Sequence, residues 1–209
     1  MKKLLATILS LTMVLSLASC AGSTDSSSKA DTTEVSSTAA TSSETTESED
    51  TVSSVTDSLE LLNTVWDSYG EDEKFAVAGG DTANMNSEGA GKYDISDAAA
   101  LDSALAFPAA EVGKIDGAAS IVHMMNANTF TGGAFHCVNA DDVSAVAEAI
   151  KTNISTRQWL CGFPEKLLIV TVDDYVVSAF GATDLVDTFK TKLTSAYSSA
   201  QIVTDEVME

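Results

Sequence analysis

The chain is poor in the residues that build most recognisable sites. Its 209 residues include two histidines, three cysteines and two prolines, and aromatic residues make up 6%. The histidines, His123 and His136, form neither an i, i+4 pair nor a His-x-His, so the common metal-site spacings are absent. The sequence also has no Cys-x-x-Cys for thiol redox chemistry and no Gly-x-Ser-x-Gly for a hydrolase nucleophile. We therefore expect no metal and no other cofactor.

Basic residues are scarce as well. Lysine and arginine number 11 against 31 aspartates and glutamates, which gives a formal charge of −20. Nucleic-acid binding needs clustered positive charge, so nucleic acid is excluded as a partner. The same charge argues against electrostatic docking on an anionic membrane.

The N-terminus holds the most informative pattern. Lys2 and Lys3 precede an apolar stretch, Leu4 to Leu17, that is too short to span a bilayer. This arrangement is typical of a cleaved secretory signal over residues 1–19. Leu17-Ala18-Ser19-Cys20 resembles a bacterial lipobox, which implies cleavage between Ser19 and Cys20 and a diacylglyceryl group on Cys20. Two acyl chains anchor a protein stably, so we expect a palmitate-type lipoprotein on the extracytoplasmic face of the cell membrane.

Residues 20–50 begin with the lipidated cysteine and continue as a tether. Sixteen of the thirty residues from 21 to 50 are Ser or Thr, and seven are Asp or Glu. Such a composition cannot bury enough apolar surface to offset its ordering entropy. We interpret it as a flexible spacer between the membrane and a globular domain over residues 51–209.

The folded part begins with a helical stripe. Val52, Val55, Leu59, Leu62, Trp66 and Tyr69 recur every three or four residues, and Gly70 ends the pattern. A short strand is expected at 75–78, a polar loop at 81–95 and a short helix after Ser96. Residues 109–131 are ambiguous, because the apolar run 118–125 suits a helix or a strand.

The C-terminal part has a clearer pattern. A strand at 133–138 is followed by a helix from Asn139 to about residue 160, then by a hairpin of strands 167–172 and 175–180, and then by a helix from Thr183. This β-α-β-β-α order predicts a single α+β domain with helices packed on a small, mostly antiparallel sheet.

Two cysteines remain once Cys20 carries the lipid. An even pair in an oxidising compartment permits a Cys137–Cys161 disulfide. However, a helix of ~18 residues between them would be ~27 Å long, whereas a disulfide needs Cα atoms within ~7 Å. We expect both thiols to be unpaired and buried.

Trp159 and Phe163 are candidate contact residues. Trp159 lies at the end of the expected helix and Phe163 lies in the Gly162-Phe163-Pro164 break after it, and exposed aromatic residues on an anchored domain favour a contact surface. Trp66 is more simply part of the core stripe of the first helix.

From about Tyr93 onward the chain resembles the DUF4358-type lipoproteins of Gram-positive bacteria, a family of unknown function. The resemblance rests on Asp94-Ile-Ser-Asp97, Leu101–Pro108, Ala134–Ala140 and the hairpin Lys166–Phe180, together with the lipobox and tether. Similar chains are sometimes labelled bacteriocin transport accessory proteins, a class whose true members resemble thioredoxins. Because this chain lacks their Cys-x-x-Cys, no redox role and no catalytic residue follows from the resemblance.

The sequence leaves two classes of function open. The absence of a recognisable catalytic constellation favours a non-catalytic binding or accessory module, export-related and acting on an envelope protein or transporter. The abundant carboxylates leave open a small cell-envelope enzyme. A two-lobed solute receptor fits poorly, because ~155 residues suit one domain.

Overall fold

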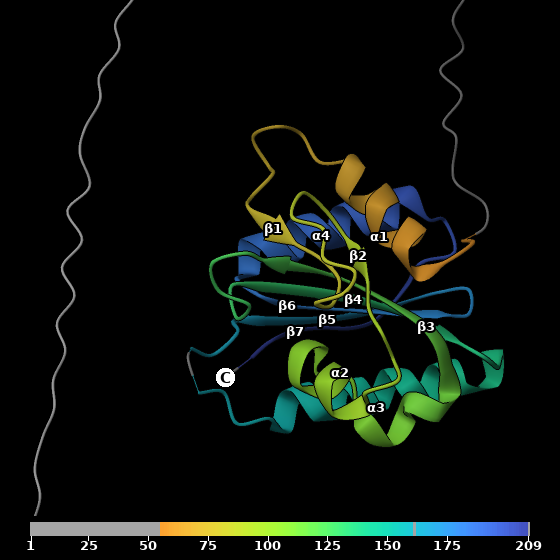
Figure 1. Cartoon of the computed structure of the whole chain (residues 1–209). Helices are drawn as coiled ribbons and strands as arrows, with labels where there is room; N and C mark the ends of the chain where they lie inside the picture. The colour runs from red at the N-terminus through yellow and green to blue at the C-terminus, as the bar shows by residue number, and fades with distance from the viewer. Residues whose placement is uncertain (1–54, 161, 209) are drawn as a thin grey trace, which may run out of the picture. The chain divides into compact units, whose positions relative to one another are not determined.

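The computed structural model describes residues 55–160 and 162–208. They form three layers, in which one sheet lies between two layers of helices (Figure 1). Helices α1 (Ser58–Asp67) and α4 (Thr183–Ala196) cover one face of the sheet. Helices α2 (Ala98–Leu105) and α3 (Val143–Thr156) cover the other face. The α+β class expected from the sequence is confirmed. None of the helices in the described residues is both long enough and apolar enough to cross a membrane.

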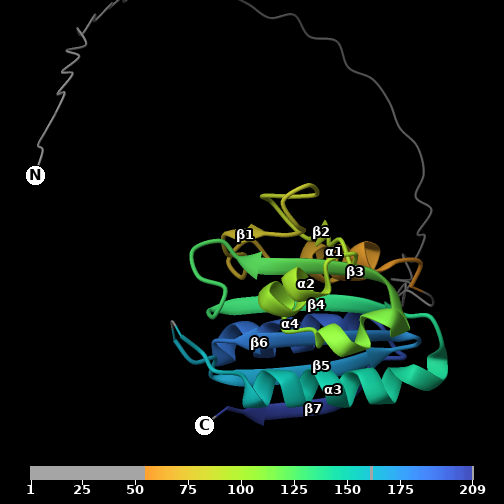
Figure 2. The ribbon, with the colours of Figure 1, turned by 60° about the horizontal axis from the view of Figure 1, so that its bottom comes forward.

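The sheet has seven strands, and every pairing in it is antiparallel. The strand order is β1-β3-β4-β6-β5-β7, with β2 also paired to β3, and the order can be followed down Figure 2. The strands are β1 (Val77–Ala78), β2 (Gly91–Lys92), β3 (Ile115–His123), β4 (Phe130–Cys137), β5 (Lys166–Val172), β6 (Tyr175–Gly181) and β7 (Gln201–Val207).

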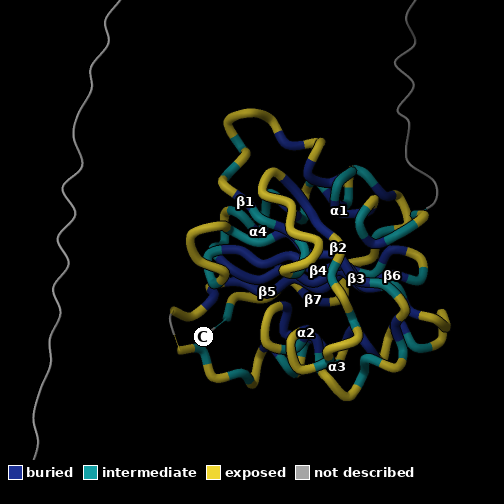
Figure 3. Tube along the Cα trace, viewed as in Figure 1, coloured by how far each residue is buried: buried dark blue, intermediate teal, exposed yellow. Residues whose placement is uncertain are grey.

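The two faces of the sheet carry separate apolar cores. Leu168, Val170 and Val177 point toward α1 and α4, whereas Leu167, Ile169 and Val176 point toward α2 and α3. Side chains alternate between the two faces along a strand, and helices cover both faces of this sheet. The residues of β5 and β6 are therefore apolar and buried at nearly every position. Figure 3 shows the resulting buried centre beneath exposed loops and helix surfaces. Removing a fully buried leucine such as Leu168 would cost about 2–5 kcal/mol.

Local patterns predicted most elements correctly. The hairpin turns at Asp173-Asp174, where Asp173 takes a left-handed φ of 51° that aspartate tolerates better than most residues. The apolar residues Val143, Val146, Ala147, Ile150 and Ile154 of α3 are buried, and Trp66 lies in the core as expected. Val52, the first residue of the expected α1 stripe, lies outside the described residues.

Three helices differ from the prediction at their ends. A 3-10 turn, Ala140–Asp142, precedes α3, which ends at Thr156 rather than near residue 160. Asp97, not Ser96, caps α2 by accepting hydrogen bonds from two backbone amides. At α4 the Glu165 carboxylate accepts hydrogen bonds from the backbone N–H and the hydroxyl of Thr183, so a distant side chain caps this helix.

Three parts of the fold went unrecognised in the sequence. The first is β2, which lies inside the expected loop 81–95 and pairs with β3. The ambiguous segment 109–131 contains a 3-10 helix, Ala109–Lys114, and strand β3. Residues 201–207 form β7, which pairs with β5 at the edge of the sheet. The chain therefore ends its fold on a strand rather than on α4.

Candidate functional site

The lipidation site lies outside the described residues. Ser19 and Cys20, the expected cleavage and lipidation positions, fall in the N-terminal stretch before residue 55, as does the tether. They remain predictions from the sequence.

The two candidate contact aromatics have different environments. Trp159 is half-buried, and its ring packs on Phe180 at a centroid distance of 5.1 Å. The Arg157 guanidinium lies 5.8 Å from the Trp159 ring centroid. Phe163 is 49% exposed, and the nearby Leu160 is 92% exposed. Trp159 is thus largely a packing residue, whereas Phe163 belongs to the accessible surface.

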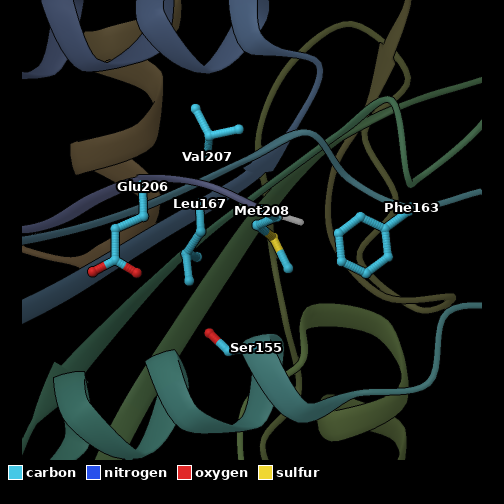
Figure 4. A pocket seen from close by; sticks show the side chains of 6 residues that line it. All are labelled: Ser155, Phe163, Leu167, Glu206, Val207 and Met208. Atoms are coloured by element: carbon cyan, nitrogen blue, oxygen red, sulfur yellow. The ribbon is translucent and has the colours of Figure 1, made fainter.

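Phe163 borders a shallow hollow of about 200 Å³ beside the edge strand (Figure 4). The Phe163 and Met208 side chains flank it on one side, and Leu167 from β5 points toward Ser155 at the end of α3. Glu206 closes the other side, and Val207 points to the opposite face of the sheet. The hollow therefore combines Phe163 with strand β7, although the two are far apart in sequence.

Strand β7 leaves a free edge on the sheet. Its partner is β5, and no other described strand pairs with it. Ile202, Val203 and Val207 are 51%, 49% and 70% exposed, respectively. An edge with exposed β-branched side chains is a template for pairing with another chain. We call β7 together with Phe163 and Met208 the β7 edge.

The ladder geometry identifies which backbone groups face outward. The Met208 N–H donates a hydrogen bond to the Glu165 carbonyl at 2.8 Å. Bonded and non-bonded pairs alternate along an antiparallel ladder, so the N–H groups of Asp205 and Val207 point away from β5. These groups are the ones available to an added strand.

The acids of β7 are neutralised by lysines from other elements. Lys166 Nζ lies 2.8 Å from Asp205 Oδ1, and Lys190 Nζ lies 2.8 Å from Asp205 Oδ2. Both lysines also pair with Asp187, and hydrogen bonds from them hold the pKa of each carboxyl below its usual 3.8. Lys151 pairs with Glu206 at 2.7 Å. The edge consequently carries less negative charge than its sequence implies.

A second cluster surrounds His136, near the end of β4. It lies beside the β5–β6 hairpin turn, at the end of the sheet opposite to the hollow beside Phe163. His136 Nδ1 bonds to Asp116, and Nε2 lies 3.1 Å from Asp174 Oδ2. His136 faces away from its neighbours Phe135 and Cys137, which belong to the α2/α3 core. Its two carboxylate partners were not recognised, because they lie 20 and 38 residues away in sequence.

The His136 cluster lacks a free base. Partial burial lowers the pKa of His136, but the hydrogen bonds to Asp116 and Asp174 outweigh this effect and raise it above the ordinary 6.5. With a carboxylate on each ring nitrogen, the imidazole has no lone pair left to activate a nucleophile. The geometry therefore gives no support to an acid–base mechanism at this histidine.

The other histidine makes local contacts. His123 stacks on Phe75 at a centroid distance of 5.6 Å, and its Nδ1 accepts a hydrogen bond from the Met125 N–H at 3.3 Å. Met124 and Met125, which follow β3, are exposed. Within residues 55–160 and 162–208, no group of three or more His, Cys, Asp or Glu side chains has a geometry that could hold a metal ion.

Cys137 is buried and free at the end of β4. Burial raises the pKa of its thiol to about 11, so it stays protonated and unreactive at neutral pH. Cys161 lies outside the described residues. Its neighbour Gly162 accepts a hydrogen bond from Asn128 Nδ2 at 2.8 Å, near the opposite end of β4 from Cys137.

Comparisons with known proteins add no assignment. The chain matches no protein-family model, no curated protein and no solved structure. Functional inference therefore rests on the geometry above.

Proposed function

We propose that this protein is a lipid-anchored lipoprotein on the extracytoplasmic face of the cell membrane, and that its domain is a non-catalytic binding or accessory module. The proposal extends to an export-related role, in keeping with the resemblance to chains labelled as transport accessory proteins. The open β7 edge is the single observation that carries the proposal for the domain. The alternative is a small carboxylate-based envelope enzyme, and His136 gives it no support as a free base, because both of its ring nitrogens lie against carboxylates.

The partner is an extended segment of another envelope protein that adds a strand to β7. Strand addition uses backbone hydrogen bonds for affinity and side-chain hollows for specificity. The outward N–H groups of Asp205 and Val207 can donate the backbone hydrogen bonds, and the hollow bordered by Phe163 and Met208 can accept a side chain. A second copy of this chain is a poor partner, because both copies carry a large negative charge. A segment that contains lysine or arginine suits this chain better.

A photo-crosslinking amino acid at position 203 in whole cells tests the proposal, because Val203 is exposed on β7. The adduct should be lost in Val207→Pro, which removes an outward N–H without removing a β5–β7 hydrogen bond. Val207→Thr, which keeps the N–H and the branched shape, should retain the adduct.

The stability of the two variants should be similar, since neither change touches the ladder. Mass spectrometry of the adduct identifies the partner and the position of its linked segment. Equal adduct yields in Val207→Pro and Val207→Thr would overturn strand addition at β7.

A further inference from the structure

A separate hollow of about 480 Å³ lies where α1 begins and the β5–β6 hairpin turns. Asp57 and Ser58 contribute from the start of α1, Asp116 from β3, His136 from β4 and Asp174 from the hairpin turn. It is at the other end of β5 from the hollow in Figure 4. Its size is within the range of pockets that hold small organic ligands.

Ser58 has an unused hydroxyl in this hollow. The residue is 5% exposed, and its Oγ has no hydrogen-bond partner in the described part of the chain. Ser58 also lines an adjoining hollow of about 200 Å³. Buried hydroxyls nearly always have a partner, because an unmet hydrogen bond is costly. The Ser58 hydroxyl is therefore an acceptor that the described part of the chain leaves unused beside this hollow.

Gly117 keeps the space between Ser58 and His136 open. A Cβ at position 117 would lie 3.6 Å from Ser58 Oγ and 3.7 Å from His136 Cβ. These are ordinary van der Waals distances, so alanine would fit without moving its neighbours. An alanine methyl would occupy the position beside the free hydroxyl.

Carboxylates outnumber basic side chains on the walls, where Asp57, Asp116 and Asp174 face Lys92 and His136. Asp57 is already engaged, since it caps α1 at Glu60 and lies 3.5 Å from Lys92 Nζ. Asp116 and Asp174 each use one oxygen on His136, and the other oxygen makes no hydrogen bond within the described residues. The pKa of the Tyr175 hydroxyl is raised to about 12, mainly by burial and further by the negative charges of Asp174, Asp57 and Asp116.

We propose that this hollow is a binding site for a primary ammonium group, carried by a small amine or by a lysine side chain. The three N–H donors of the ammonium group match three acceptors: Ser58 Oγ, the second oxygen of Asp116 and the second oxygen of Asp174. Three carboxylates face two basic side chains, Lys92 and His136, so a bound ammonium group balances the remaining negative charge, whereas an anion would add to it and a neutral alcohol would leave it unchanged. The proposal is independent of the β7 edge.

Calorimetric titration of the purified full-length protein tests the site, with two probes that separate the sources of the ammonium group. 1,5-Diaminopentane represents a free amine, and Nα-acetyl-lysine methylamide represents a lysine within a peptide. We expect saturable binding of at least one probe and none of 1,5-pentanediol. NMR shift changes should centre on the Gly117 amide and the His136 ring.

Ser58→Ala should weaken binding about tenfold, as expected for one lost hydrogen bond to a charged group. Its melting temperature without ligand should be unchanged or higher, because the hydroxyl has no partner to lose. Asp116→Asn should weaken binding by a similar or larger factor, and Gly117→Ala should also reduce it. Asp141→Asn, at an exposed acid before α3, is the matched control and should bind normally.

Two results would overturn the proposal. One is the absence of saturable binding of both amines to the wild-type protein. The other is binding that Ser58→Ala and Asp116→Asn leave as strong as in Asp141→Asn, because the amine would then lie elsewhere.

Discussion

Lys166, at the start of β5, and Asp205, in β7, form an ion pair of 2.8 Å that joins the last strand to the interior of the sheet. Lys166 is a buried lysine, and Asp187 from α4 supplies its second carboxylate. Three elements thus meet at one ammonium group. The pairing explains how an acidic strand lies against an acidic domain.

Asp205→Asn should destabilise the domain by about 1–3 kcal/mol, between the effects of surface and buried ion pairs. Its folded pKa lies below the usual value, chiefly because of the Lys166 hydrogen bond. The stabilisation is therefore present above the unfolded pKa of about 4 and is lost as the pH falls through the folded pKa. Urea unfolding of wild type and variant between pH 3 and 7 measures this. Glu148→Gln, on the exposed surface of α3, serves as the control. A constant difference across that range would contradict the assignment.

His136 should stabilise the fold in its protonated form. Its folded pKa is above 6.5, so its contribution is complete below about pH 6.5 and is lost as the pH rises through the folded pKa. The effect should be at most about 1 kcal/mol, because Asp116 and Asp174 are substantially exposed and screened by solvent. NMR titration of the His136 ring measures the pKa directly. In Asp174→Asn this pKa should fall, and an unchanged value would show that the pair is not formed in solution.

The Cys137 thiol should be inert and unpaired. Reductant should leave the wild-type melting temperature unchanged, and a thiol reagent should modify Cys137 only after unfolding, because burial raises its pKa to about 11. Cys137→Ser should cost about 1–3 kcal/mol by placing a hydroxyl in an apolar site. A mass difference of two protons between reduced and untreated denatured protein would instead reveal a disulfide with Cys161.

Cys20 should carry the lipid. Cys20→Ala should abolish incorporation of a fatty-acid analogue and leave the signal segment uncleaved by the lipoprotein peptidase. The variant Ser19→Ala keeps a small residue before the cysteine and should still be labelled. Equal labelling of wild type and Cys20→Ala would contradict the lipobox interpretation.

The sequence by itself determined the elements whose signals are local. Helix α3 was visible in the spacing of Val143, Val146, Ala147, Ile150 and Ile154, and the β5–β6 hairpin in two apolar runs around Asp173-Asp174. Periodicity records which face of an element is buried, so these elements and the α+β class could be predicted without knowing their neighbours.

Only the tertiary structure decided the position of β7 and the composition of both hollows. Residues 201–207 contain two adjacent acids, and they form a strand because Lys151, Lys166 and Lys190 come from other elements to neutralise them. Asp116, His136 and Asp174 are ordinary residues in their own segments and become a cluster when β3, β4 and the hairpin turn align. Charge pairing and hydrogen bonding act at contact distance, and for residues so far apart in sequence the register of the sheet and the packing of α3 and α4 on it set that distance.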